Sequence, residues 1–101
     1  MASYKIIILE SAITDISDSC IYYNKAVSGL GFEFEEEVFR LLQLIKQNPF
    51  LFPIKFANIH EAVLSTFPFV INYELLDKII VVTAVFHTRQ KPVKKINRKK
   101  K

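Results

Sequence analysis

Two runs of β-branched and aromatic residues flank a short polar turn at Asp77-Lys78, within the segment FPFVINYELLDKIIVVTAVFHTR at residues 67–89. Such runs on either side of a tight turn predict a β-hairpin. A two-residue turn at this position places Leu75 opposite Ile80 and fixes every later pair, because a slip of one residue would exchange the two faces of the hairpin. This segment therefore constrains the fold more than any other.

The predicted register gives the hairpin one apolar face and one mixed face. The apolar face pairs Leu75 with Ile80, Tyr73 with Val82, Ile71 with Ala84 and Phe69 with Phe86. The mixed face pairs Glu74 with Val81, Asn72 with Thr83, Val70 with Val85 and Pro68 with His87. We expect the apolar face to lie beneath helices. Small proteins seldom expose a continuous apolar patch, so Val70, Val81 and Val85 are expected to contact a protein partner.

The N-terminal half predicts a strand followed by two helices. Residues 4–9 (YKIIIL) favour a strand, and Ser11 follows as a candidate helix N-cap. Gly29 and Gly31 mark the turn between the helices, and Asn48-Pro49 ends the second helix. The apolar stripe of the first helix comprises Ala12, Ile16, Cys20, Tyr23 and Val27, and that of the second comprises Phe34, Val38, Leu41 and Ile45.

Residues 54–59 predict a weak strand that leads through His60 and Glu61 into residues 62–66, ahead of the hairpin. The element order is therefore β-α-α-β-β-β. This order predicts an α+β fold in which an N-terminal helical hairpin packs on one face of an antiparallel sheet. A chain of 101 residues has the size of a single domain, placed at residues 1–98, with residues 99–101 as a basic C-terminal tail.

The sequence also narrows the cellular compartment and the cofactors. Cys20 is the only cysteine, so no disulfide can form within the chain, and no apolar run is long enough for a signal-peptide core or a transmembrane helix. These features predict a cytoplasmic protein with no membrane partner. No metal-ligand spacing and no glycine-rich phosphate loop is present, so we expect neither a metal nor a small-molecule cofactor.

Charge is distributed unevenly along the chain. Residues 89–101 carry eight Lys or Arg and no acid, whereas residues 1–88 carry six Lys or Arg and ten Asp or Glu. A basic segment of this kind binds phosphates or an acidic protein partner, with an affinity that falls as salt is added. The alternative interpretation is a solubilising tail that has no partner.

Several short motifs follow one another in an order similar to that of a known family. They are Ala12…Asp15-Ile16…Tyr22-Tyr23, Gly29-Leu30-Gly31, Asn48-Pro49, Phe67-Pro68-Phe69…Asn72-Tyr73, and Ala84-Val85-Phe86-His87 ahead of Pro92. Over about residues 4–98 the chain resembles the RelE/ParE toxin family, whose members were once labelled plasmid-stabilisation proteins. The hairpin motifs are closer to the ParE-like side of that family.

The resemblance implies the toxin of a type II toxin–antitoxin module. Such a toxin inhibits growth by binding a macromolecular target and is neutralised by a cognate antitoxin protein. ParE-like members inhibit DNA gyrase, whereas RelE-like members are ribosome-dependent endoribonucleases that cleave mRNA. The alternatives to a gyrase-directed toxin are therefore an mRNA endoribonuclease and a non-toxic relative that retains only antitoxin binding.

If the chain is a nuclease, His87 is the candidate acid or base and Arg89 the candidate phosphate ligand, because RNA cleavage needs proton transfer and nearby cations. The competing interpretation of His87 is a strand-end histidine bonded to backbone. No Tyr, Phe or Trp follows Phe86, which disfavours a nuclease because the RNA bases would lack a stacking platform. Further candidates for nucleic-acid or target contacts are Lys55, His60, Arg89, Lys91, Lys94, Lys95 and Arg98.

The chain departs from the ParE-like pattern at three positions. That pattern usually has an arginine on the strand before the Phe-Pro pair, where this chain has His60. It also usually ends the last strand with His-x-x-Arg-x-Pro, where Gln90 occupies the arginine position and Arg89 precedes it. The long Arg89 side chain would still reach the same space. A tryptophan that often follows is absent, and Ile96 is expected to take its packing role.

Overall fold

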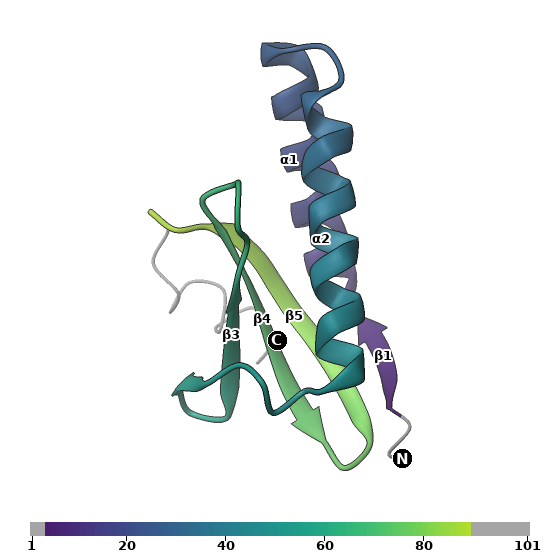
Figure 1. Ribbon diagram of the computed structural model, residues 1–101, viewed down its shortest axis with the longest axis vertical. Coiled ribbons are helices and arrows are strands. Elements are labelled where there is room, and N and C mark those ends of the chain that lie inside the picture. The colour runs from purple at the N-terminus through teal and green to yellow at the C-terminus, as the bar shows by residue number, and fades with distance from the viewer. Residues whose placement is uncertain (1–3, 90–101) are drawn as a thin grey trace.

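The fold is that of a computed structural model, which describes residues 4–89. The elements in order are β1 (Lys5–Ile8), α1 (Glu10–Ala26), α2 (Leu30–Gln47), β2 (Ile54–Phe56), β3 (Ile59–Val63), β4 (Phe69–Leu76) and β5 (Ile79–His87) (Figure 1). The predicted α+β class is confirmed, as is the order of one strand, two helices and a C-terminal group of strands. The predicted domain boundary at residue 98 lies outside the described residues.

The sheet has the strand order β1-β5-β4-β3-β2. Strands β2 to β5 pair antiparallel in sequence order, but β1 pairs parallel with β5, so the sheet is mixed rather than wholly antiparallel. The mixed sheet arises because the two helices lie between β1 and the other strands along the chain. No tight turn links β1 to β5, so nothing forces the two strands to run in opposite directions.

The single strand predicted over residues 54–59 is instead two short strands. Ala57 has a φ of 49°, in the left-handed region, and the chain turns back there between β2 and β3. The sheet therefore has five strands where the sequence predicted four. Asn58, beside Ala57 in this turn, is of a residue type common in turns, and the prediction of a single strand did not use that signal.

The two helices begin and connect differently from the prediction. Leu9 is the residue before α1, and the Ser11 hydroxyl donates to the Thr83 carbonyl oxygen at 3.2 Å, so Ser11 is not an N-cap. Between the helices, Gly29 has a φ of 87°, a conformation that costs other residues about 1–2 kcal/mol. Gly31 already lies in α2, where a Cβ would come within 2.0 Å of the Cys20 carbonyl oxygen. Glycine at 31 thus permits the close approach of the helices.

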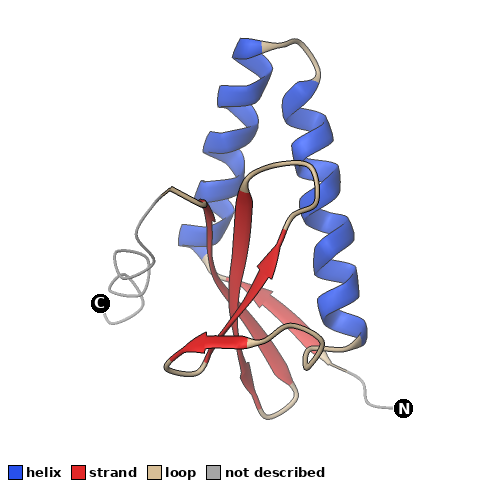
Figure 2. Ribbon diagram, turned by 60° about the vertical axis from the view of Figure 1, so that its left-hand side comes forward, coloured by secondary structure: helices blue, strands red, loops and turns tan. Residues whose placement is uncertain are grey.

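The helical hairpin covers one face of the sheet and encloses the main core (Figure 2). The predicted stripe of α2 is confirmed, because Phe34, Val38, Leu41 and Ile45 are all buried. On α1 only Ala12 and Ile16 are fully buried, Cys20 and Tyr23 are partly buried, and Val27 is exposed beyond the helix end. Among the helices of residues 4–89, none is long and apolar enough to cross a membrane.

Glu37 of α2 holds the loop that precedes the C-terminal hairpin. Its carboxylate accepts hydrogen bonds from the backbone N–H groups of Ser65 and Thr66, the latter at 2.9 Å. A carboxylate that accepts two successive amides fixes the loop strongly, since bonds to an ionised acceptor are stronger than neutral ones. This contact sets the position from which Phe67 and Phe69 enter the core, where both lie beside Tyr23.

Candidate functional site

The hairpin of β4 and β5 follows the predicted register only near its turn. Leu75 pairs with Ile80 and Tyr73 with Val82, as expected, and Asp77 has a φ of 58° in a two-residue turn. Between Asn72 and Tyr73 the register shifts, because Thr83 is an extra residue on β5. Such a bulge moves all later pairs of one strand by one residue and turns its side chains to the other face.

The bulge corrects the predicted partner-binding face. Val85 now pairs with Ile71 and lies in the main core beneath the helices, so it does not share a face with Val70. Instead, Ala84 and Phe86 join Val70 in a second, smaller buried cluster. Val81 remains opposite Glu74 and is half-buried. The expected exposed patch of Val70, Val81 and Val85 therefore does not exist as one surface.

The same shift relocates His87 to the side of the sheet that carries the helices. His87 pairs with Phe69, and its ring meets the Phe69 ring edge to face at 5.3 Å. With Val85 it lines an open groove of about 750 Å³ between α1 and the end of β5. The other residues that line this groove are Ser11, Thr14, Asp15, Asp18, Ser19, Tyr22, Tyr23 and Phe69. The prediction that His87 points away from the helices is wrong.

Backbone contacts fix the His87 ring. Its Nδ1 accepts a hydrogen bond from the Arg89 backbone N–H at 3.1 Å. A ring nitrogen that accepts a bond carries no proton, so this contact requires the neutral ring to hold its proton on Nε2. The Arg89 side chain is exposed beside it. The backbone-bonded interpretation of His87 therefore holds for its Nδ1.

The groove beside His87 is acidic. Asp15 and Asp18 of α1 line it, and no Lys or Arg among residues 4–89 does. The Asp15 carboxylate also accepts the Val85 backbone N–H at 3.0 Å, on the part of β5 that β1 does not pair. Carboxylates disfavour the approach of a phosphate backbone, since nucleic-acid binding depends on neutralising phosphates with cations. Within the described residues, the surroundings of His87 suit a protein or a cationic group better than RNA.

The sheet face opposite the helices contains two buried polar side chains on β4. Asn72 is 1% exposed, and neither its Oδ1 nor its Nδ2 has a hydrogen-bond partner among the described residues. Glu74, two residues further on, is also buried. A buried amide without a partner costs about 1–3 kcal/mol, so such groups in folded proteins call for an explanation in function. The sequence could have identified Asn72 as a candidate functional residue, because it is a polar residue in a hairpin strand that is otherwise mostly apolar.

The remaining predicted contacts are separated from one another. His60 is only 7% exposed, stacks on the Tyr73 ring at 4.8 Å, and its Nδ1 lies 2.7 Å from the Phe52 carbonyl oxygen. It is a core residue, and its prediction as a surface contact is wrong. Lys55 is exposed on the edge strand β2. The other predicted contacts, Lys91, Lys94, Lys95 and Arg98, lie outside the described residues, as do Gln90 and Ile96.

A metal site was not expected, and the described part of the chain offers no candidate for one. Across residues 4–89, no group of three His, Cys, Asp or Glu side chains is arranged to hold a metal ion. The pKa of the Cys20 thiol is raised by burial and, secondarily, by the charge of Glu35. A raised thiol pKa lowers the thiolate fraction, so Cys20 lacks the character of a nucleophile.

Comparison with known proteins places the fold. No protein-family model matches the sequence, and no curated protein matches it. A chain of the chromosomal ParDE toxin–antitoxin system from P. aeruginosa has a similar structure, with a TM-score of 0.76 and 11% identity over 83% of this chain and 95% of that one. The isolated RelE toxin of E. coli gives a TM-score of 0.65 and 16% identity over 97% of this chain and 98% of that one. The chain therefore has the RelE/ParE toxin fold.

Proposed function

We propose that this protein is the toxin of a type II toxin–antitoxin module and that it inhibits growth by binding a macromolecular target. The observation that carries the proposal is the likeness of nearly the whole chain to two solved structures, one from a ParDE system and one a RelE toxin. The order of motifs in the sequence supports it independently. A cognate antitoxin is the partner that this function requires.

For the target, we favour DNA gyrase over the ribosome. The groove beside His87 is lined by Asp15 and Asp18, which disfavour the phosphates of an mRNA. The chain also has no Tyr, Phe or Trp after Phe86 on which a base could stack. Both features weaken the nuclease alternative and leave binding to a protein target as the better account.

Induced expression in bacteria tests the target directly. Plasmid supercoiling and the 5′ ends of cellular mRNA should be measured in the same cultures, with His87→Ala beside the wild type. The proposal predicts altered supercoiling, no new mRNA ends within codons, and growth inhibition that His87→Ala retains. Lys78→Ala, at the opposite end of the hairpin, is the matched control. Codon-spaced mRNA cleavage that His87→Ala abolishes would instead establish the ribosome-dependent nuclease.

The antitoxin is tested by co-expression. The reading frame adjacent to the gene should be expressed with the toxin, and the two products should purify as one complex. Restored growth together with complex formation supports the module. If the adjacent product neither binds the chain nor restores growth, that product is not the antitoxin. If expression of the chain alone leaves growth unchanged, the remaining reading is a non-toxic relative.

A further inference from the structure

The last described residues of the chain lie at the groove between α1 and the end of β5. His87 lines this groove, and the Arg89 backbone N–H bonds to the His87 ring at 3.1 Å. Residues 90–101, hereafter the C-terminal segment, follow directly. The C-terminal segment therefore starts within three residues of a side chain that lines the groove, which is a surface within its immediate reach.

The groove presents two carboxylates and an exposed aromatic ring. Asp15 and Asp18 line it from α1, and so does Tyr22, which is 70% exposed. These three residues follow one another at spacings of three and four, so they form a row on one face of the helix. Carboxylates pair with the cationic heads of Lys and Arg, while an aromatic ring contacts either their heads or their apolar stems. The row is thus suited to a basic peptide.

The C-terminal segment has the complementary charge. It contains seven Lys or Arg and no acid, whereas residues 1–88 carry ten acids against six Lys or Arg. Its twelve residues reach up to about 40 Å when extended, and the row from Asp15 to Tyr22 is about 10 Å long. The C-terminal segment is therefore long enough to turn back from Arg89 and lie along the whole row.

We propose that the C-terminal segment binds in the groove beside His87, with its Lys and Arg side chains against Asp15, Asp18 and Tyr22. One exposed ion pair contributes only about 0–1 kcal/mol, so the binding depends on several pairs acting together. It also depends on the tether, because a short link raises the effective concentration of the segment at the groove to the order of millimolar. Cations bound there are withheld from phosphates. The inference does not depend on the toxin function, since it rests on the charges of this chain alone.

Carbodiimide cross-linking of the full chain tests the contact. The reagent couples a carboxylate to a neighbouring Lys amine with loss of water, and mass spectrometry of the peptides identifies the pair. We expect links from Asp18 to lysines of the C-terminal segment, such as Lys94 and Lys95. Their yield should fall severalfold between about 50 and 500 mM salt, because salt screens exposed charges.

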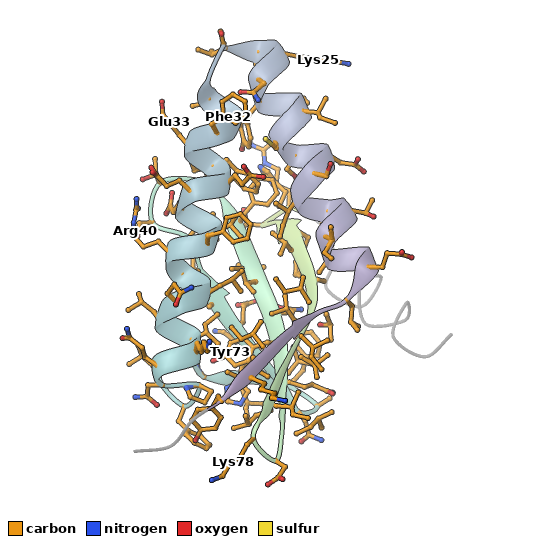
Figure 3. The ribbon with its side chains drawn as sticks, turned by 90° about the vertical axis from the view of Figure 1, so that its right-hand side faces the viewer. Lys25, Phe32, Glu33, Arg40, Tyr73 and Lys78 are labelled. Carbon is orange, nitrogen blue, oxygen red and sulfur yellow. The ribbon has the colours of Figure 1, made fainter. Side chains whose placement is uncertain are left out.

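Glu33 provides the reference carboxylate in the same sample. It is exposed on α2, and Figure 3 shows it pointing to the side of that helix away from α1. Chance encounters would link the C-terminal segment to any exposed carboxylate, whereas a bound segment reaches only those at the groove. Links to Asp18 should therefore exceed links to Glu33 at least tenfold.

Two matched variants give a second measurement. Trypsin cuts after Lys and Arg, and a bound segment is cut only from its released state, so the rate of cleavage reports the released fraction. Asp18→Asn should raise the rate of cleavage within the C-terminal segment about threefold. Glu33→Gln is the control, because it also removes one negative charge from an exposed helical side chain, and it should leave the rate unchanged.

Three results would overturn the proposal. Equal yields of links to Asp18 and Glu33 would show that the C-terminal segment contacts exposed carboxylates at random. Equal cleavage rates in Asp18→Asn and Glu33→Gln would show that the groove does not hold the segment. Links that join two chains, detected as mixed masses after ¹⁵N-labelled and unlabelled protein are combined, would assign the groove to the C-terminal segment of a second copy.

Discussion

The Asp15 carboxylate accepts the Val85 backbone N–H at 3.0 Å, which joins the middle of α1 to the edge of β5. Strand β1 pairs with β5 only as far as Val82, so no strand in the described part of the chain pairs with the edge beyond that residue. Side chains of α1 take its place, because Ser11 also donates to the Thr83 carbonyl oxygen on this edge. An exposed strand edge can pair with a strand of another molecule, and helix α1 covers this edge of β5.

Replacement of Asp15 by alanine should destabilise the protein by about 1–2 kcal/mol, because the Val85 N–H would lose its acceptor. Urea unfolding followed by circular dichroism measures this difference. Asp18→Ala is the matched control, since Asp18 lies one turn later on α1 and is exposed, and it should change stability by no more than about 0.5 kcal/mol. Equal effects of the two substitutions would show that the Asp15 contact contributes nothing.

The two glycines should differ in their tolerance of alanine. Gly31→Ala should be severely destabilising, by about 3 kcal/mol or more, because the new Cβ would lie 2.0 Å from a backbone oxygen that cannot move alone. At Gly29 a Cβ meets nothing within 4 Å, so only the strain of its positive φ remains, about 1–2 kcal/mol. Thermal unfolding of both variants checks the order. If the Gly31→Ala protein were more stable than the Gly29→Ala protein, the close packing of α1 and α2 would be contradicted.

Asn72→Val should stabilise the protein by about 1–2 kcal/mol, since it removes a buried amide that has no hydrogen-bond partner within residues 4–89 and adds a residue that favours strands. Thr83→Val provides the contrast. The Thr83 hydroxyl donates to the Asn72 carbonyl oxygen at 3.3 Å, so this second apolar substitution should cost about 1 kcal/mol. If Asn72 serves the target, Asn72→Val will also reduce growth inhibition in spite of its greater stability.

Alkaline pH should destabilise the fold through Tyr73. Burial raises the pKa of Tyr73 from 10.0 to about 12, and its hydroxyl donates to the Pro49 carbonyl oxygen at 2.7 Å. Between these two values the unfolded chain loses the proton while the folded chain keeps it. The stabilisation is therefore complete below about pH 10 and is lost as the pH rises toward 12, by at most about 1.4 kcal/mol per pH unit.

Urea unfolding at several pH values from 8 to 12 measures this slope. Tyr73→Phe should be less stable than the wild type at pH 8, because it lacks the bond to Pro49, and should show a smaller loss on going to pH 12. The same alkaline slope in both proteins would show that other tyrosines or lysines cause it.

The elements that the sequence predicted well are those with a strong period. The α2 stripe from Phe34 to Ile45 is confirmed in full, since a helix that faces a sheet needs apolar residues on one side only. The turn at Asp77-Lys78 and the first pairs of the hairpin are confirmed for the same reason. Periodicity specifies which face of an element is buried, and it does so reliably within one element.

The elements that were missed depend on single residues without a distinctive pattern. The Thr83 bulge sits within an apolar run in which either register buries aliphatic side chains, so the sequence did not distinguish them. This bulge alone reversed the sides of Val85 and His87. His60 was read as a surface residue because polar side chains usually are, whereas its stacking on Tyr73 depends on a pairing of β3 with β4 that no local signal encodes.

The central claim, that this chain is a toxin, is tested most directly by counting colonies after induced expression. Cells should carry the gene under a tightly repressed promoter, and a frameshifted copy should serve as the control for expression burden. The account predicts that induction lowers colony counts by at least tenfold relative to the frameshifted control. Accumulation of folded protein at full colony counts would contradict it.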